Sequence, residues 1–124
     1  MKALYVLMLI FLFSCSTSKM VQTDLYFGRL RLDGSTISNE EWNDFTTSYF
    51  NRYFHEGSTT MAATGTWFDK ERQEFVNEQT FVVSYIHQKR ATISLRIDSV
   101  RAAYKNTFQQ QSVLRVDRKI RISF

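Results

Sequence analysis

Residues 59–87, TTMAATGTWFDKERQEFVNEQTFVVSYIH, predict a long β-hairpin at the centre of the fold. Residues 59–68 and 79–87 are rich in threonine, valine and aromatic residues, which favour β-strands. Residues 69–78 between them are strongly charged and are expected to form the tip of the hairpin. The two strands are therefore expected to pair with each other in antiparallel orientation.

An amphipathic helix is predicted on each side of this hairpin. Upstream, Ser38 as N-cap and Glu41 three residues later form a capping-box pattern, and Gly57 is expected to adopt a left-handed conformation after the helix. Aromatic residues at helical spacing predict a helix over 39–54. Its apolar stripe is Trp42, Phe45, Tyr49, Phe50 and Tyr53, with Trp42 expected to anchor the helix to the sheet. Downstream, a second helix is predicted over 92–109, with a core-facing stripe of Ile93, Ile97, Val100, Tyr104 and Phe108.

One further strand is predicted beyond each helix. Residues 23–32, TDLYFGRLRL, alternate as a strand and are followed by a turn signal at 33–35, while residues 112–124 are strand-like. The order is therefore β-α-β-β-α-β. With right-handed crossovers, this order predicts a ferredoxin-like α+β sandwich. In that fold a four-stranded antiparallel sheet carries two helices on one face, and the first and last strands are neighbours.

The N-terminal segment MKALYVLMLIFLFSC has the layout of a bacterial secretory signal. Lys2 precedes an apolar run over 3–13 that is too short to span a membrane, and Ser14 stands directly before Cys15, the single cysteine. This arrangement resembles a lipoprotein signal. We therefore expect a signal peptide over 1–14, acylation with palmitate at Cys15, a lipidated tether over 15–23 and one domain over 24–124. The alternative is a plain secretory signal, or an uncleaved anchor, with an incidental cysteine.

The expected location follows from the same segment. A lipidated Cys15 would hold the protein on a membrane of the bacterial cell envelope, facing the periplasm. Ser16 follows Cys15, and no aspartate stands there to indicate retention at the inner membrane. The outer membrane is therefore the expected site of anchoring.

Composition indicates one packed domain and argues against a nucleic-acid partner. Without residues 1–14, 110 residues remain, which suffice for one compact core. The loss of Lys2 leaves 15 basic against 12 acidic residues, a net charge of +3 that is too small to indicate nucleic-acid binding. The last ten residues, RVDRKIRISF, contain four of the basic residues. This cluster favours a charged edge strand, and a site for an anionic ligand is the alternative.

Several short motifs in order resemble those of a known family. They are LYFGR at 25–29, EW at 41–42, GTW at 65–67, RAAYK at 101–105 and QSVLRVD at 111–117. On these motifs the chain resembles the bacterial domain-of-unknown-function 3574 (DUF3574) family of small exported domains, often lipoproteins, over residues 24–124. The resemblance implies an exported domain but no reaction, because the family has no established activity.

No motif for catalysis, metal binding or cofactor binding stands out. His55 and His87 have no ligand partner at the spacing of a metal site, and each is expected to be a single surface histidine. The sequence has no nucleophile elbow, phosphate loop or dinucleotide fingerprint. Gly28 and Gly65 lie within predicted strands, where glycine is typical of a bulge or of close packing by a helix. We therefore expect no cofactor and no metal.

Side-chain alternation in the first strand defines a candidate ligand site. Tyr26 and Gly28 share one face of the strand, and Phe27 and Arg29 share the other. If a helix packs closely on Gly28, then Phe27 and Arg29 lie on the uncovered face of the sheet. Arg115 in the last strand is expected to reach the same face beside Arg29.

Aromatic residues of the middle strands, Trp67 or those within 81–85, would wall this patch. Two arginines among aromatic side chains suit a small anionic ligand that carries a carboxylate or a phosphate. The predicted ligand-binding residues are Arg29, Arg115, Phe27 and Trp67. Because two neighbouring cations repel, a protein carboxylate or a bound anion is expected between the arginines.

Two classes of function stay open at this point. The first is a non-catalytic envelope lipoprotein that binds a partner, a second copy of itself or a small anionic ligand. An uncovered apolar sheet face usually means association, with the arginines paired across the interface or with Asp117 or Glu78. The second class is an enzyme of the dimeric ferredoxin-like type with a sheet-face pocket, which rests on analogy of fold alone. A closed pocket that joins both arginines to His87 or Tyr85 would favour the enzyme.

Overall fold

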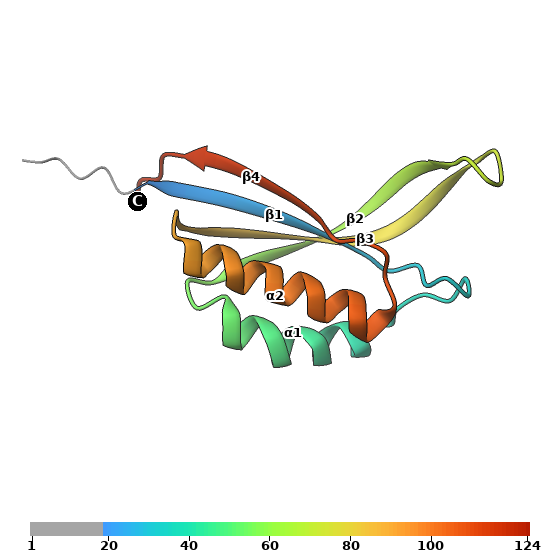
Figure 1. Ribbon diagram of the computed structural model, residues 1–124, viewed down its shortest axis with the longest axis horizontal. Coiled ribbons are helices and arrows are strands. Elements are labelled where there is room, and N and C mark those ends of the chain that lie inside the picture. The colour runs from blue at the N-terminus through green and yellow to red at the C-terminus, as the bar shows by residue number, and fades with distance from the viewer. Residues whose placement is uncertain (1–18) are drawn as a thin grey trace, which may run out of the picture.

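The six elements follow the predicted order β-α-β-β-α-β in the computed structural model, which describes residues 19–124 (Figure 1). They are β1 (Met20–Gly28), α1 (Asn39–Tyr53), β2 (Ser58–Asp69), β3 (Glu74–Gln88), α2 (Ala91–Phe108) and β4 (Leu114–Ile120). The strands form one antiparallel sheet in the order β2-β3-β1-β4, and both helices cover the same face of it (Figure 1). The ferredoxin-like sandwich is thus confirmed, with the first and last strands as neighbours.

Local signals placed the ends of α1 accurately. The Ser38 hydroxyl accepts a hydrogen bond from the Glu41 backbone at 3.1 Å, and the Glu41 carboxylate accepts one from the Ser38 backbone at 2.8 Å. The predicted capping box is therefore present. At the other end, Gly57 has a φ of 90°, a left-handed conformation that suits glycine. This residue turns the chain from α1 into β2.

The strands differ from their predicted lengths. The structure extends β2 and β3 through most of the charged segment 69–78, so the tip of the hairpin is only residues 70–73. Charged side chains are compatible with these strands because both of their faces are exposed to water there. We call residues 65–79 the hairpin arm, which projects beyond the helices (Figure 1).

The first strand is shifted toward the N-terminus. It begins at Met20 rather than at residue 23, so residues 20–23 belong to the sheet and not to a tether. It ends at Gly28, because the chain then turns into a loop closed by an isolated bridge between Leu30 and Thr36. Cys15 and the signal segment lie outside the described residues.

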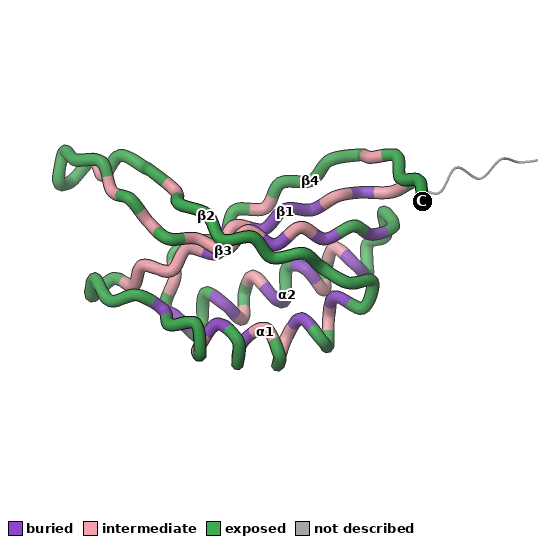
Figure 2. Tube along the Cα trace, turned by 180° about the vertical axis from the view of Figure 1, so that it is seen from behind, coloured by how far each residue is buried: buried purple, intermediate pink, exposed green. Residues whose placement is uncertain are grey.

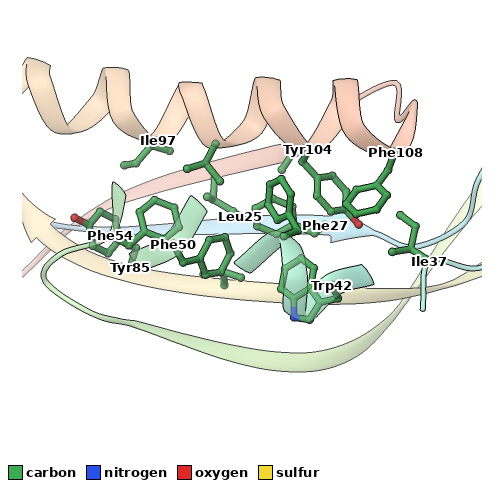
Figure 3. Close-up of a cluster of buried hydrophobic side chains, with 14 of the residues drawn as sticks. Leu25, Phe27, Ile37, Trp42, Phe50, Phe54, Tyr85, Ile97, Tyr104 and Phe108 are labelled. Atoms are coloured by element: carbon green, nitrogen blue, oxygen red, sulfur yellow. The ribbon is translucent and has the colours of Figure 1, made fainter. Parts of the chain in front are cut away.

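The core fills the space between the helices and the inner strands. Buried positions concentrate in β1, β3 and the inward sides of both helices, whereas β2 and β4 are largely exposed (Figure 2). Figure 3 shows Phe27 of β1 among aromatic residues from both helices. Its ring centroid lies 5.3 Å from that of Trp42 and 4.8 Å from that of Tyr104. Trp42 is 5% exposed and also stacks on Phe81 of β3, as expected of an anchor between helix and sheet.

The predicted orientation of β1 is wrong. Leu25 and Phe27 are fully buried beneath the helices, so Tyr26 and Gly28 lie on the uncovered face. The space beside Gly28 is filled by a carboxylate and not by a helix: a Cβ at this position would clash with the Glu78 Oε1 atom. Glu78 uses this oxygen to accept a hydrogen bond from the Leu30 backbone at 3.0 Å. Gly28 therefore lets Glu78 close the end of β1.

Candidate functional site

An apolar row crosses the whole uncovered face of the sheet. Strand register places one residue from each strand side by side in this row, namely Met61, Val82, Tyr26 and Leu114. The two outer members are open to solvent, since Met61 is 49% and Leu114 58% exposed. The two inner members are half-buried. The row thus presents apolar surface over the full width of the sheet, which is typical of a contact surface.

A polar network lies next to the apolar row on the same face and begins two residues further along the strands. The Gln22 amide donates hydrogen bonds of 3.0 Å to Asp24 and to the Ser84 hydroxyl, and Arg118 forms an ion pair with Asp24. Burial raises the pKa of Asp24, but the hydrogen bonds from its neighbours and the Arg118 charge outweigh burial and hold it below its usual value. Asp24 is therefore ionised and neutralised by Arg118 within the same face.

Arg115 belongs to the helix-covered side of the sheet and is fully engaged there. Its guanidinium lies 3.0 Å from an Asp98 oxygen of α2 and 3.1 Å from Asp117 of its own strand. Burial lowers the pKa of Arg115, but the carboxylates of Asp117 and Asp98 raise it above its ordinary value. Arg115 therefore ties β4 to α2, and protein carboxylates already neutralise its charge.

Arg29 lies on the same side of the sheet but in another environment. Its Nε and Nη2 atoms donate to the Ile37 carbonyl at 2.8 and 2.6 Å, and its guanidinium lies 4.7 Å from the centre of the Phe81 ring. It also lines an open cavity of about 430 Å³ over β2 and β3. Arg29 and Arg115 have no common partner in the part of the chain that the structure describes.

The other two predicted site residues are placed apart from this cavity. Phe27 is fully buried in the core and is not open to a ligand. Trp67 is 46% exposed on the hairpin arm and does not line the cavity at Arg29. Phe81, which was one of several candidate wall residues, is the aromatic side chain that meets Arg29. The structure therefore brings together one predicted arginine and one aromatic wall residue.

His87 is buried, which corrects the expectation of a surface histidine. It is 3% exposed, and its Nε2 atom lies 2.8 Å from the Thr23 hydroxyl, which donates to Asp117 at 2.6 Å. This chain of side chains joins β3, β1 and β4. Because Thr23 is fully buried, no substrate can reach its hydroxyl, and the arrangement stabilises the sheet. The sequence signal was weak, because the three residues are far apart in the chain and meet only through register.

Arg29 lies apart from His87 and Tyr85, whose rings stack on each other with centroids 4.9 Å apart. His87 lines a second cavity at the start of α2, separate from the one at Arg29. Tyr85 donates a hydrogen bond to Glu56, and burial together with this bond raises the pKa of its phenol. Residues 19–124 contain no cluster of His, Cys, Asp or Glu side chains that could hold a metal ion. Neither helix in that range is long and apolar enough to cross a membrane.

Comparison with known families identifies the domain. The profile of the family described as "Protein of unknown function (DUF3574)" matches residues 22–124, and the chain belongs to this family. The match confirms the resemblance of the short motifs and covers every element of the sheet and both helices except the first two residues of β1. A search of curated protein sequences gave no match.

Two solved structures share the fold at low sequence identity. Phage SAM lyase in complex with S-methyl-5'-thioadenosine superposes with a TM-score of 0.66 and 13% identity, over 82% of each chain. The phage SAM lyase in its apo state gives a TM-score of 0.61, also with 13% identity over 82% of each chain. At this identity the likeness establishes the fold and leaves the function open.

Proposed function

We propose that this member of the DUF3574 family is a non-catalytic lipoprotein of the cell envelope whose domain binds a second copy of itself through the uncovered sheet face. The observation that carries the proposal is the apolar row, with Met61 and Leu114 about half exposed on opposite edge strands. In a two-fold dimer the row of one copy would cross the row of the other and remove both from water.

The area of this face suits a small but stable interface. Strands about 4.8 Å apart make a sheet of four strands about 19 Å wide, and the seven residues of β4 span about 23 Å, or about 440 Å² per copy. The two copies would then bury about 900 Å², against about 1,200 Å² for a stable specific interface. Calculated from the same strand spacings, the hairpin arm adds about 160 Å² per copy, which brings the total buried area to about 1,200 Å². Trp67 and Val76, paired across the arm, supply its apolar surface on this face.

Charge also favours a second copy over an anionic partner. The chain carries a net charge of +4, yet on this face Arg118 is neutralised by Asp24. This ion pair therefore adds no net charge to the interface, and the Glu78 carboxylate beside Gly28 leaves the face without an excess of positive charge. A nucleic acid or an anionic lipid surface would find no free cation at the apolar row.

Anchoring in the envelope is proposed from the sequence of residues 1–15. A lipid on Cys15 would hold the domain at a membrane surface, and two copies held on one membrane have a raised effective concentration. This would favour association through a modest interface. The proposed location is the periplasmic side of the outer membrane.

Sedimentation of the full-length chain in density-matched detergent tests the association. The wild type is expected to sediment as a dimer, and Leu114→Lys as a monomer because a charge replaces apolar surface at the row. Leu95→Lys is the matched control, since Leu95 is 67% exposed on the outer side of α2. A monomeric wild type, or equal loss of dimer in both variants, would contradict the proposal.

An enzyme remains the second candidate because of the shared fold with phage SAM lyase. Two assays test this alternative directly. In the first, the full-length chain is incubated with SAM and the loss of SAM is followed. In the second, a thermal-shift assay measures the melting temperature with and without S-methyl-5'-thioadenosine. The proposal of a non-catalytic domain predicts no loss of SAM above the uncatalysed rate and no shift of the melting temperature. Consumption of SAM that scales with protein concentration would establish the enzyme instead.

A further inference from the structure

The cavity at Arg29 lies where the helices leave the sheet uncovered on their own side. Helix-facing residues of β2 are exposed, because α1 and α2 pack over β1 and β3 and stop short of this edge strand. The resulting space of about 430 Å³ lies between β2, β3 and Asn39, the first residue of α1. It is within the range of cavities that hold small molecules.

Arg29 differs from the comparable arginines of the domain in having no acidic partner. Within residues 19–124, five arginines are half-buried, and four of them lie within 3.7 Å of a carboxylate oxygen. Those four are Arg31, Arg96, Arg101 and Arg115. Arg29 forms no ion pair with any aspartate or glutamate of the same range, and its polar partner there is the neutral Ile37 carbonyl. Its positive charge is therefore uncompensated at the wall of a cavity.

The Arg29 side chain is held in place before any ligand arrives. Two of its nitrogens are fixed by the Ile37 carbonyl, and its guanidinium carbon lies over the ring of Phe81, which in turn stacks on Trp42 with centroids 4.5 Å apart. The remaining N–H donors of the guanidinium have no hydrogen-bond partner among the described residues. A binding group that is already ordered loses little conformational entropy when it binds.

We propose that this cavity is a binding site for a small organic monocarboxylate. One uncompensated guanidinium matches one negative charge, and its planar donors suit a carboxylate. Asn39, Thr64 and Gln79 line the cavity with further polar groups, whereas Ala62 and Phe81 offer apolar surface to the body of the ligand. The site is on the opposite side of the sheet from the apolar row, so it is independent of the proposed self-association.

Titration of the full-length chain in detergent with benzoate, followed by two-dimensional NMR, tests the site. Benzoate is expected to shift the resonances of Arg29, Ala62 and Phe81 saturably, and the uncharged benzamide is expected not to. Arg29→Gln should weaken benzoate binding about tenfold or more, because a charge-assisted bidentate contact is lost. Arg52→Gln removes the same charge from an exposed position on α1 and should leave the dissociation constant unchanged.

A second variant keeps the test decisive if Arg29→Gln does not fold. Ala62→Trp fills the cavity from an exposed position of an edge strand and leaves the bonds between Arg29 and Ile37 in place. It should abolish binding while the melting temperature stays close to that of the wild type. Absence of saturable shifts in the wild type would overturn the proposal, as would equal affinity in Arg29→Gln. Tighter binding of inorganic phosphate than of benzoate would refute the assignment to a monocarboxylate.

Discussion

Replacement of Trp42 by alanine should remove a large part of the stability of this domain. Trp42 is 5% exposed and contacts Phe27 of β1 and Phe81 of β3, so it links α1 to both central strands. Deleting a buried tryptophan side chain costs about 3–5 kcal/mol. The entropy of unfolding of a domain of this size is about 0.2 kcal/mol/K, so the melting temperature should fall by about 15–25 °C.

The second tryptophan provides the matched control. Trp67 is 46% exposed on the hairpin arm, and Trp67→Ala should cost less than about 1 kcal/mol, or at most about 5 °C. Both variants are compared by circular dichroism in a Leu114→Lys background, so that loss of association does not contribute to the difference. Equal shifts for the two variants would refute the placement of Trp42 as the link between helix and sheet.

Three further predictions follow from the buried polar groups and the N-terminal segment. Thr23→Val should destabilise the domain by about 1–3 kcal/mol, because His87 and Asp117 lose the hydroxyl between them, and Thr23→Ser should restore it; calorimetry gives both values. The pKa of Asp24 is lower in the folded state than in the unfolded chain. Its contribution to the free energy of unfolding is therefore complete above about pH 4 and is lost as the pH falls further. Urea unfolding at several pH values should show that the stability of Asp24→Asn falls less at acidic pH than that of the wild type. Cys15→Ser should abolish incorporation of labelled palmitate, and labelling equal to that of the wild type would show that Cys15 is not the acylated residue.

The order of elements was predictable because its signals are local. Helical spacing of aromatic residues, the capping box at Ser38 and the glycine at 57 each depend on residues within a few positions of one another. The length of the hairpin was not predictable in this way. Its charged residues pair across the arm with both faces in water, where polarity no longer distinguishes strand from loop.

The covered face of β1 was assigned wrongly because one glycine outweighed the composition of the strand. Alternation alone divides its residues into two sets but does not say which set the helices cover. The even-numbered set contains Gln22 and Asp24, whereas the odd-numbered set contains Leu25 and Phe27, so composition favoured the observed orientation. Weight given to Gly28 as a helix contact led to the opposite assignment. Its actual neighbour, Glu78, is fifty positions away in sequence and could not be identified from local pattern.

The candidate site shows the same limit. Arg29 was identified from the sequence, but its partners Ile37 and Phe81 depend on a loop conformation and on pairing between β1 and β3. Arg115 and Arg29 lie on the same side of the sheet but in different surroundings, because Asp98 of α2 forms an ion pair with Arg115 and not with Arg29. Odd or even position along a strand therefore predicts on which side of the sheet a side chain lies. Contacts with other elements decide whether its charge is neutralised.

An isotope-filtered NOE experiment on methionine methyl groups tests the proposed association most directly. Two of the four methionines, Met20 and Met61, belong to the uncovered sheet face, and Met61 is 49% exposed in the apolar row. Full-length copies that are deuterated except for ¹³C-labelled methionine methyl groups are mixed with unlabelled copies in deuterated detergent. Any contact from a labelled methyl group to an aliphatic or aromatic proton of protein then joins two copies. The proposal predicts contacts from the Met61 methyl group to Tyr26, Val82 or Leu114 of the other copy. Absence of such contacts at concentrations where the chain sediments as a dimer would contradict association through this face.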